Sequence, residues 1–205
     1  MKTKTALLTG AAGLALGLMV VTAPADIVGS AHDFSGEGWS DNEICKPCHT
    51  PHHSMVEVTR APLWNHALPD IGQVYNLHSG DYSRDDALDG RSVLCMGCHD
   101  GTVALDSYGG ATGGDFINGD ELIGTDLVND HPVGRDGIYP LVPWMNDPST
   151  WEGGHGPHLE DMIIDGNPER VVSCTTCHEP HNRQGLGMLW RSNDASALCL
   201  MCHIK

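Results

Sequence analysis

Basic and aromatic residues are both scarce in this sequence of 205 residues. Eleven lysines and arginines stand against 27 acidic residues, which gives a net charge of −16, and aromatic residues make up 5% of the chain. A chain this acidic has no basic face for a phosphate backbone, which excludes nucleic acid as a natural partner. The charge favours a soluble, self-repelling surface, with basic proteins or metal cations as the partners it would attract.

Long apolar segments are also few, and the only long one opens the chain. A basic start, Met1–Lys4, is followed by an uncharged run from Ala6 to Val21 and by Ala23-Pro-Ala25. This order predicts an export signal at 1–25 that is cleaved, with a retained membrane anchor as the alternative. Loss of its two lysines leaves nine basic residues and a net charge of −18. No later stretch is apolar enough to cross a membrane, so we expect no membrane span after cleavage.

All eight cysteines lie in four C-x-x-C-H motifs. The motifs are Cys45, Cys48 and His49; Cys95, Cys98 and His99; Cys174, Cys177 and His178; and Cys199, Cys202 and His203. This motif attaches c-type haem, because two thiols on one helical turn reach the two vinyl groups and the histidine becomes the proximal iron ligand. Disulfides or zinc would also use eight cysteines, but neither requires a histidine after each pair. The sequence therefore predicts four haem c groups.

Four porphyrins would also supply the core that the side chains lack. Periodic apolar segments are few, and glycine and proline together number 37. We therefore expect a mostly coil fold with short α-helices, wrapped around a stacked tetrahaem core, without substantial β-sheet. Helices are expected at 158–165 and 194–201, and no set of alternating strands is evident. A chain without haem should not fold.

The motifs form two similar modules. The pattern C-x-x-C-H-x-P-H, then Leu-Trp, then Leu-C-x-x-C-H occurs at 45–99 and again at 174–205. A repeat of this kind predicts two haem-pair modules within one domain, 26–205. The remainder is an N-terminal arm at 26–44 and a loop-rich insertion at 100–173. Acidic residues in the insertion match no EF-hand spacing, so we expect a solvated loop rather than a calcium site.

Nine histidines remain as candidates for the second iron ligand. Two imidazoles saturate the iron, which suits electron transfer at low potential and leaves no position for a substrate. His52 and His181 each follow a proximal histidine by three residues. So short a segment, with a proline in it, cannot pass around the macrocycle, so each would bind a different haem from the one beside it.

The predicted second ligands are His32, His52, His131 and His181, with His66 and His53 in reserve. Hydrogen bonding to a haem propionate is the alternative role for His52 and His181. Exposure or propionate bonding is the more common role for the others, His78, His155 and His158.

Longer stretches of the sequence resemble one family. CKPCHTPHH, APLWNH, LCMGCHDGTVALDSYGG, LVNDHPVG, CHEPHN with LW, and the terminal LCLMCHIK are similar to the OmcE-type tetrahaem extracellular cytochromes, which polymerise into nanowire filaments. The resemblance covers nearly the whole mature chain. It implies bis-histidine haems in a continuous row, little regular secondary structure, and a histidine that ligates a haem of the next subunit. By motif this residue is His52, although His53 directly after it leaves open which of the two crosses.

These features predict an electron-transfer protein rather than an enzyme. It would be a head-to-tail homopolymer, exported to the cell surface, that passes electrons from redox partner proteins to extracellular acceptors. A soluble periplasmic tetrahaem carrier is the alternative. A multihaem reductase is less favoured, because the chain has no C-x-x-C-K motif, which active haems of nitrite reductases often show.

Overall fold

The computed structural model describes residues 27–58, 61–140 and 142–204, and the predicted signal peptide at 1–25 lies outside them. Most of this chain forms turns and irregular loops. The regular elements are α1 (Arg84–Ala87), α2 (Gly90–His99), α3 (Cys174–Cys177), β1 (Val74–Leu77), β2 (Gly80–Ser83), β3 (Glu160–Ile164) and β4 (Asn167–Val171), with single 3-10 turns at Phe34–Gly36, Gly119–Glu121, Gly134–Gly137, Pro148–Thr150, Asp194–Ser196 and Cys199–Met201. The predicted fold class, mostly coil with short helices and no substantial sheet, is confirmed.

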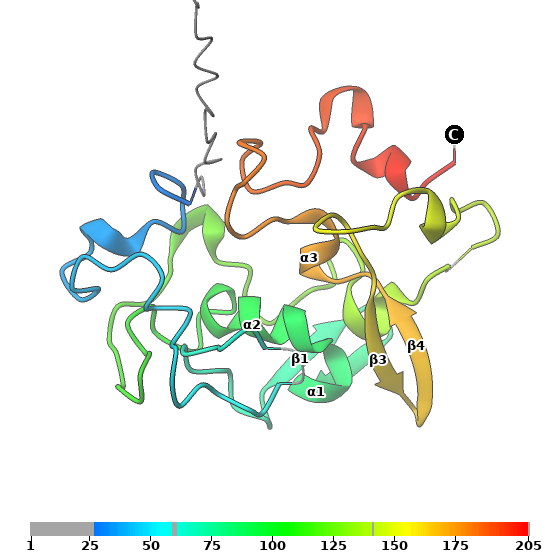
Figure 1. Ribbon diagram of the computed structural model, residues 1–205. Coiled ribbons are helices and arrows are strands. Elements are labelled where there is room, and N and C mark those ends of the chain that lie inside the picture. Colours follow the sequence, from blue (N-terminus) through cyan, green and yellow to red (C-terminus); the bar gives the residue numbers. More distant parts are fainter. Residues whose placement is uncertain (1–26, 59–60, 141, 205) are drawn as a thin grey trace, which may run out of the picture.

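Helix α2 lies near the middle of the molecule, and α3 packs beside it (Figure 1). Helix α1 and strand β3 both contact α2, and the β1–β2 hairpin packs against α1. In the described part of the chain, no helix is long and apolar enough to cross a membrane. The two central helices therefore carry cysteine motifs of both modules to the same region.

The start of α2 is determined by Asp89. Its side chain accepts hydrogen bonds from the backbone nitrogens of Arg91 and Ser92, at 3.0 and 3.1 Å. These are donors that an α-helix leaves unpaired in its first turn, and an aspartate at the cap position pairs them. Asp89 also accepts from the hydroxyl of Ser173, the residue before α3, at 2.9 Å. One buried carboxylate therefore joins the two motif-bearing helices.

The helix predicted at 158–165 is wrong, because Glu160–Ile164 is strand β3. Its residues alternate between buried and exposed, the period of a strand with one covered face. Asp165 and Gly166 both have positive φ angles and form the turn into β4. Asp-Gly at this position is a strong signal for a two-residue hairpin, and this signal outweighs the helical tendency of the preceding residues. Two small hairpins form where no set of alternating strands was evident, and they do not amount to a substantial sheet.

The continuous helix predicted at 194–201 is also wrong. Two separate 3-10 turns occupy this segment, at Asp194–Ser196 and Cys199–Met201. Ala195 and Ser196 have φ angles of 51° and 65°, in the left-handed region that an α-helix cannot include. The second turn begins at Cys199, the first cysteine of the fourth motif.

The hydrophobic core consists of three small clusters. The first lies among the β1–β2 hairpin, α1 and α2 and contains Tyr75, Leu77, Ala87, Leu88, Val93, Met96 and Leu127. The second contains Tyr139, Trp151, Leu159, Val172 and Met201, and the third Met162, Ile164 and Val171. None is large enough to organise a chain of this length, in agreement with the thin side-chain core expected from composition.

Candidate functional site

Each cysteine motif forms a single turn of helix. In three of them the backbone nitrogen of the histidine donates to the carbonyl of the first cysteine: His49 to Cys45 at 2.8 Å, His178 to Cys174 at 2.9 Å, and His203 to Cys199 at 2.9 Å. The remaining motif forms the last turn of α2. One turn brings both thiols to the same side, the geometry needed to bond two vinyl groups of one porphyrin. None of the eight cysteines forms a disulfide.

The two modules share backbone geometry beyond the motifs. Thr50 N donates to Leu63 O at 2.9 Å, and Glu179 N donates to Met188 O at 2.8 Å. Leu63 and Met188 both have positive φ angles, 55° and 67°. In each module, the first motif therefore hydrogen-bonds in the same manner to a later extended segment, residues 63–65 or 188–190, which we call the return segment.

In the structure, the return segments of the two modules match with a shift of one residue from the match of their Leu-Trp pairs in the sequence. The carbonyl of Cys48 accepts from Asn65 N, whereas the carbonyl of Cys177 accepts from Trp190 N. Trp64 is thus the structural counterpart of Leu189, and the two Leu-Trp pairs are out of register. Hydrogen bonds to the motif, rather than the indole side chain, determine the register.

Neighbouring motifs approach one another through their thiols. The pKa of Cys98 is raised to about 12, mainly by burial and also by nearby Cys48. The pKa of Cys95 is raised by a hydrogen bond with Cys174 and by burial. These contacts join the first motif to the second, and the second to the third.

The third motif is joined to the fourth in the same way. Burial raises the pKa of Cys177 to about 11, and Cys202 adds to the increase. Each motif therefore has a thiol near a thiol of the next motif in the chain.

Three proximal histidines are each faced by a second imidazole. The ring centroids of His49 and His181 are 6.0 Å apart, those of His99 and His32 are 6.2 Å apart, and those of His203 and His131 are 6.3 Å apart. Imidazole nitrogens bind metals at about 2 Å, so two such bonds in line, together with the two rings, separate the ring centres by roughly 6 Å. Each pair has the separation needed to hold one iron between its two rings.

In four of these histidines, the Nδ1 atom lies beside a backbone carbonyl oxygen, and Nε2 remains as the atom that can bind a metal. Nδ1 of His49 lies 2.6 Å from Pro62 O, and Nδ1 of His99 lies 2.8 Å from Glu121 O. The same nitrogen of His32 lies 3.0 Å from Pro180 O, and that of His131 lies 3.1 Å from Pro132 O. A metal-bound histidine donates its other N–H to a carbonyl or carboxylate in this way, which directs Nε2 to the metal.

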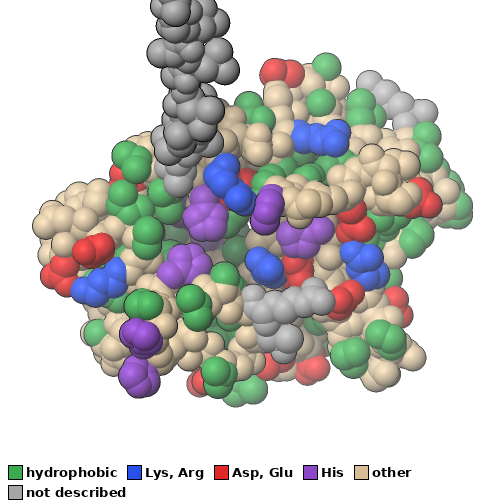
Figure 2. Space-filling model, viewed as in Figure 1, with side chains coloured by type: hydrophobic (Ala, Val, Ile, Leu, Met, Phe, Trp, Pro, Cys, Tyr) green, Lys and Arg blue, Asp and Glu red, His purple; other side chains and the backbone are tan. Residues whose placement is uncertain are grey.

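The donor set therefore fits haem c. Covalent attachment requires paired thiols, which each motif supplies on one turn. Axial ligation requires two imidazoles with room for an iron between them, and here backbone carbonyls hold their Nδ1 atoms. The pKa of His32 is lowered by burial and by the nearby imidazoles of His99, His181 and His178. Figure 2 shows several histidine rings gathered on one face of the molecule.

His178 differs from the other proximal histidines. Within residues 27–58, 61–140 and 142–204, no aromatic or imidazole ring stacks opposite it, and its side chain is exposed. His52, the remaining predicted second ligand, is exposed as well, and so is His53. These two histidines line a cavity of about 420 Å³ with Thr50, Met55, Trp64, Asn65, Gly109 and Gly110.

The reserve candidate His66 has a different environment. It is 1% exposed, its Nδ1 lies 2.7 Å from Ala67 O, and its Nε2 lies 3.1 Å from Ala104 O. With both ring nitrogens beside carbonyl oxygens, this residue is suited to tie the first module to the insertion. His158 is paired instead with Glu160, Nε2 to Oε1 at 2.7 Å, and His78 and His155 are exposed.

Glu179 is a residue that the sequence analysis did not single out. It is fully buried, and its Oε1 lies 3.3 Å from Nδ1 of His181. A signal was available, because the first module has threonine where the second has this glutamate, CHTPH against CHEPH.

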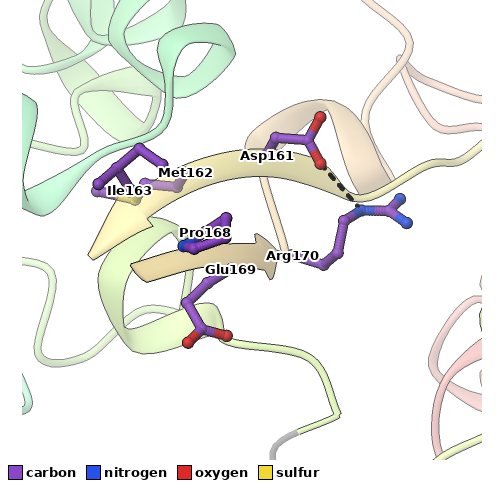
Figure 3. A pocket seen from close by; sticks show the side chains of 6 residues that line it. All are labelled: Asp161, Met162, Ile163, Pro168, Glu169 and Arg170. Carbon is purple, nitrogen blue, oxygen red and sulfur yellow. Dashed lines mark ion pairs between the residues drawn. The ribbon is translucent and has the colours of Figure 1, made fainter. Parts of the chain in front are cut away.

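A second cavity, of about 280 Å³, lies on the β3–β4 hairpin, away from the motifs (Figure 3). Its lining residues are Asp161, Met162, Ile163, Pro168, Glu169 and Arg170. Arg170 Nε and Asp161 Oδ1 are 3.5 Å apart at one end of it. With neither thiol nor histidine in its lining, this cavity contributes nothing to a haem site.

Comparison with known proteins agrees with this geometry. The protein family described as "Doubled CXXCH motif" matches residues 167–205, which include β4 and the whole second module. No curated protein matches the chain. The paired motif indicates a multihaem c-type cytochrome that binds haem covalently and transfers electrons.

Proposed function

We propose that this cytochrome carries four bis-histidine haems, is exported, and joins head to tail into an extracellular filament that conducts electrons. A bound haem supplies a reversible one-electron iron couple, and two imidazoles per iron leave no position for a substrate. The thiols of the chain would anchor the porphyrins, and backbone carbonyls beside Nδ1 would orient the imidazoles. We therefore expect no enzymatic activity, and a high-spin signal in the resting oxidised protein would contradict this.

The proposal rests on one difference between the proximal histidines, which is whether a second imidazole of the same chain lies opposite the ring. Three are faced by a second imidazole of the same chain, whereas His178 has no such ring among the described residues. His52 is exposed on the other module and has the chemistry to complete the set. We propose that His52 of one subunit binds the iron held by His178 in the next subunit.

This contact would join two different surfaces of the same chain. A contact of this kind repeats without limit unless the rotation between subunits closes a ring, so it generates a filament. Electrons would pass between haems of neighbouring motifs within a subunit, whose thiols lie near one another. The haem at the third motif would then belong to two subunits at once.

Electron microscopy of the purified native holoprotein tests the proposal. We expect filaments from the natural chain, separate subunits from His52→Ala, and filaments again from the matched variant His53→Ala. The His52→Ala subunits should also have one haem with an altered low-spin spectrum. Uniform single subunits from the natural chain, or filaments that persist in His52→Ala, would refute the assembly.

The second candidate is a soluble periplasmic carrier, which the net charge of −16 favours because like-charged subunits repel one another. Gel filtration at low and high salt separates the two proposals. If the protein remains a single subunit at high salt, where repulsion is screened, the carrier is correct.

A further inference from the structure

Glu179 is held in a fully buried position between the third motif and His181. Its Oε1 accepts from the backbone nitrogen of His181 at 3.2 Å and lies 3.3 Å from Nδ1 of the same residue. Its Oε2 accepts from the backbone nitrogen of Arg183, and Arg183 Nε is 3.3 Å from Oε1. Donors surround both oxygens, so the carboxylate is fixed beside the imidazole.

This contact distinguishes His181 from the other predicted ligands that have an Nδ1 partner. Nδ1 of His32, His49, His99 and His131 faces a neutral backbone carbonyl in each case. Within the described part of the chain, His181 is the predicted ligand whose Nδ1 faces a carboxylate.

The first module provides an internal comparison. Thr50 is the counterpart of Glu179, since each donates its backbone nitrogen to the return segment of its module. The hydroxyl of Thr50 donates to the carbonyl of His52 at 2.8 Å, so it bears no charge toward the ring. The modules thus differ in charge at the residue that follows the proximal histidine.

A carboxylate that accepts the Nδ1 proton makes the imidazole more basic and fixes its orientation. A more basic ligand and a nearby negative charge both stabilise ferric iron more than ferrous iron. We propose that Glu179 is a positioning residue that, through His181, lowers the reduction potential of the haem held by His49 and His181. On reduction one electron enters at the iron, and the Nδ1 proton stays on the ring.

Arg183 opposes this effect, because its guanidinium offsets part of the carboxylate charge. The inference rests on the proposed function only in taking His49 and His181 as the two ligands of one iron. It does not depend on assembly into filaments. The haem at this site would be reduced less readily than it would be without Glu179.

Potentiometric titration of the holoprotein, followed by optical and electron paramagnetic resonance spectra, tests the inference. Glu179→Gln should raise the midpoint potential of one haem, and Glu179→Thr, which copies the first module, should do the same. The expected shift is about tenfold in the ratio of oxidised to reduced haem, or about 59 mV for a one-electron couple. Arg183→Gln, which keeps Glu179, should shift the same haem in the opposite direction.

Glu169→Gln on strand β4 is the matched control, since it removes a carboxylate away from the motifs and should leave every potential unchanged (Figure 3). His181→Ala identifies the affected haem, because loss of that ligand changes one low-spin spectrum. If it does so while Glu179→Gln, Glu179→Thr and Arg183→Gln leave all potentials unchanged, Glu179 has no such role. If His181→Ala changes no haem spectrum, the ligand pair itself is wrong, which overturns this inference and that part of the proposed function together.

Discussion

The imidazole rings of His49 and His181 are almost parallel, with 18° between their planes and 6.0 Å between their centroids. His49 is the last residue of the first motif and His181 follows the third, so the contact crosses between the two modules. His181 also lies three residues after His178, whose ring it does not face. If both histidines bind iron, the third motif and His181 of the second module serve two different haems.

The angles between facing rings predict two kinds of low-spin iron signal. The planes of His32 and His99 are at 54° and those of His131 and His203 at 67°, far from the 18° of the parallel pair. Parallel imidazoles donate into the same iron orbital and give a rhombic spectrum, whereas crossed rings give a strongly anisotropic one. Electron paramagnetic resonance of the oxidised protein should resolve both kinds, and His181→Ala should remove a rhombic component. A single class of signal would contradict the observed angles.

The sequence was informative about the chemistry because thiols and imidazoles must be spaced to fit a porphyrin. His32, His131 and His181 were predicted as second ligands, and each lies opposite a proximal histidine, although their binding of iron remains a prediction. Which ring faces which could not be predicted. These pairs join distant parts of the chain through a cofactor, so no local pattern encodes them.

The errors in secondary structure have two different causes. The β3–β4 hairpin was predictable from Asp165-Gly166, a turn signal that was outweighed by an apparent helical pattern. The break at Ala195 and Ser196 has no such signal, because both residues are compatible with a helix and adopt left-handed angles only in this context. Tertiary constraints near the fourth motif override local propensity there.

Substitution of Asp89 should destabilise both central helices. Its carboxylate is 1% exposed and accepts from the hydroxyls of Ser92 and Ser173 at 2.6 and 2.9 Å, besides capping α2. Asp89→Ala removes the cap and leaves buried donors unpaired, which should cost roughly 2–4 kcal/mol of unfolding free energy. Chemical denaturation of the holoprotein measures this loss.

Asp86→Ala is the matched control for that experiment. Asp86 lies in α1, and its carboxylate accepts from the hydroxyl of Ser83 at an exposed position. Its removal should change stability by no more than about 0.5 kcal/mol, as for most surface substitutions. Equal losses of unfolding free energy from the two substitutions would contradict a stabilising role for the hydrogen bonds of Asp89.

The pair of His158 and Glu160 should make stability depend on pH. The pKa of His158 is raised, chiefly by its hydrogen bond with Glu160. Because the folded pKa exceeds the unfolded value, the pair stabilises the fold fully below the unfolded pKa, and this contribution is lost as pH rises through the folded pKa. His158→Gln should therefore lower the melting temperature more at roughly pH 5.5 than at roughly pH 8.5.

Exposed His155 provides the comparison for this measurement. His155→Gln should shift the melting temperature equally little at both pH values. If His158→Gln destabilises more at the alkaline value, the sign of the linkage is wrong and the ion pair does not operate as described.

Without haem, the chain should not reach a stable fold. The buried apolar residues in the described part of the chain form three small clusters, and many motif thiols and imidazoles are partly exposed. The conformational entropy of ordering long loops has to be offset by burial, and clusters of this size bury too little surface. Protein produced without the haem attachment machinery should show little dispersion in its proton nuclear magnetic resonance spectrum and rapid proteolysis. Cys174→Ala with Cys177→Ala should lose one haem by mass and destabilise the remaining holoprotein, because the third motif contacts both the second and the fourth. A well-dispersed spectrum from the haem-free chain would contradict this dependence of the fold on its cofactors.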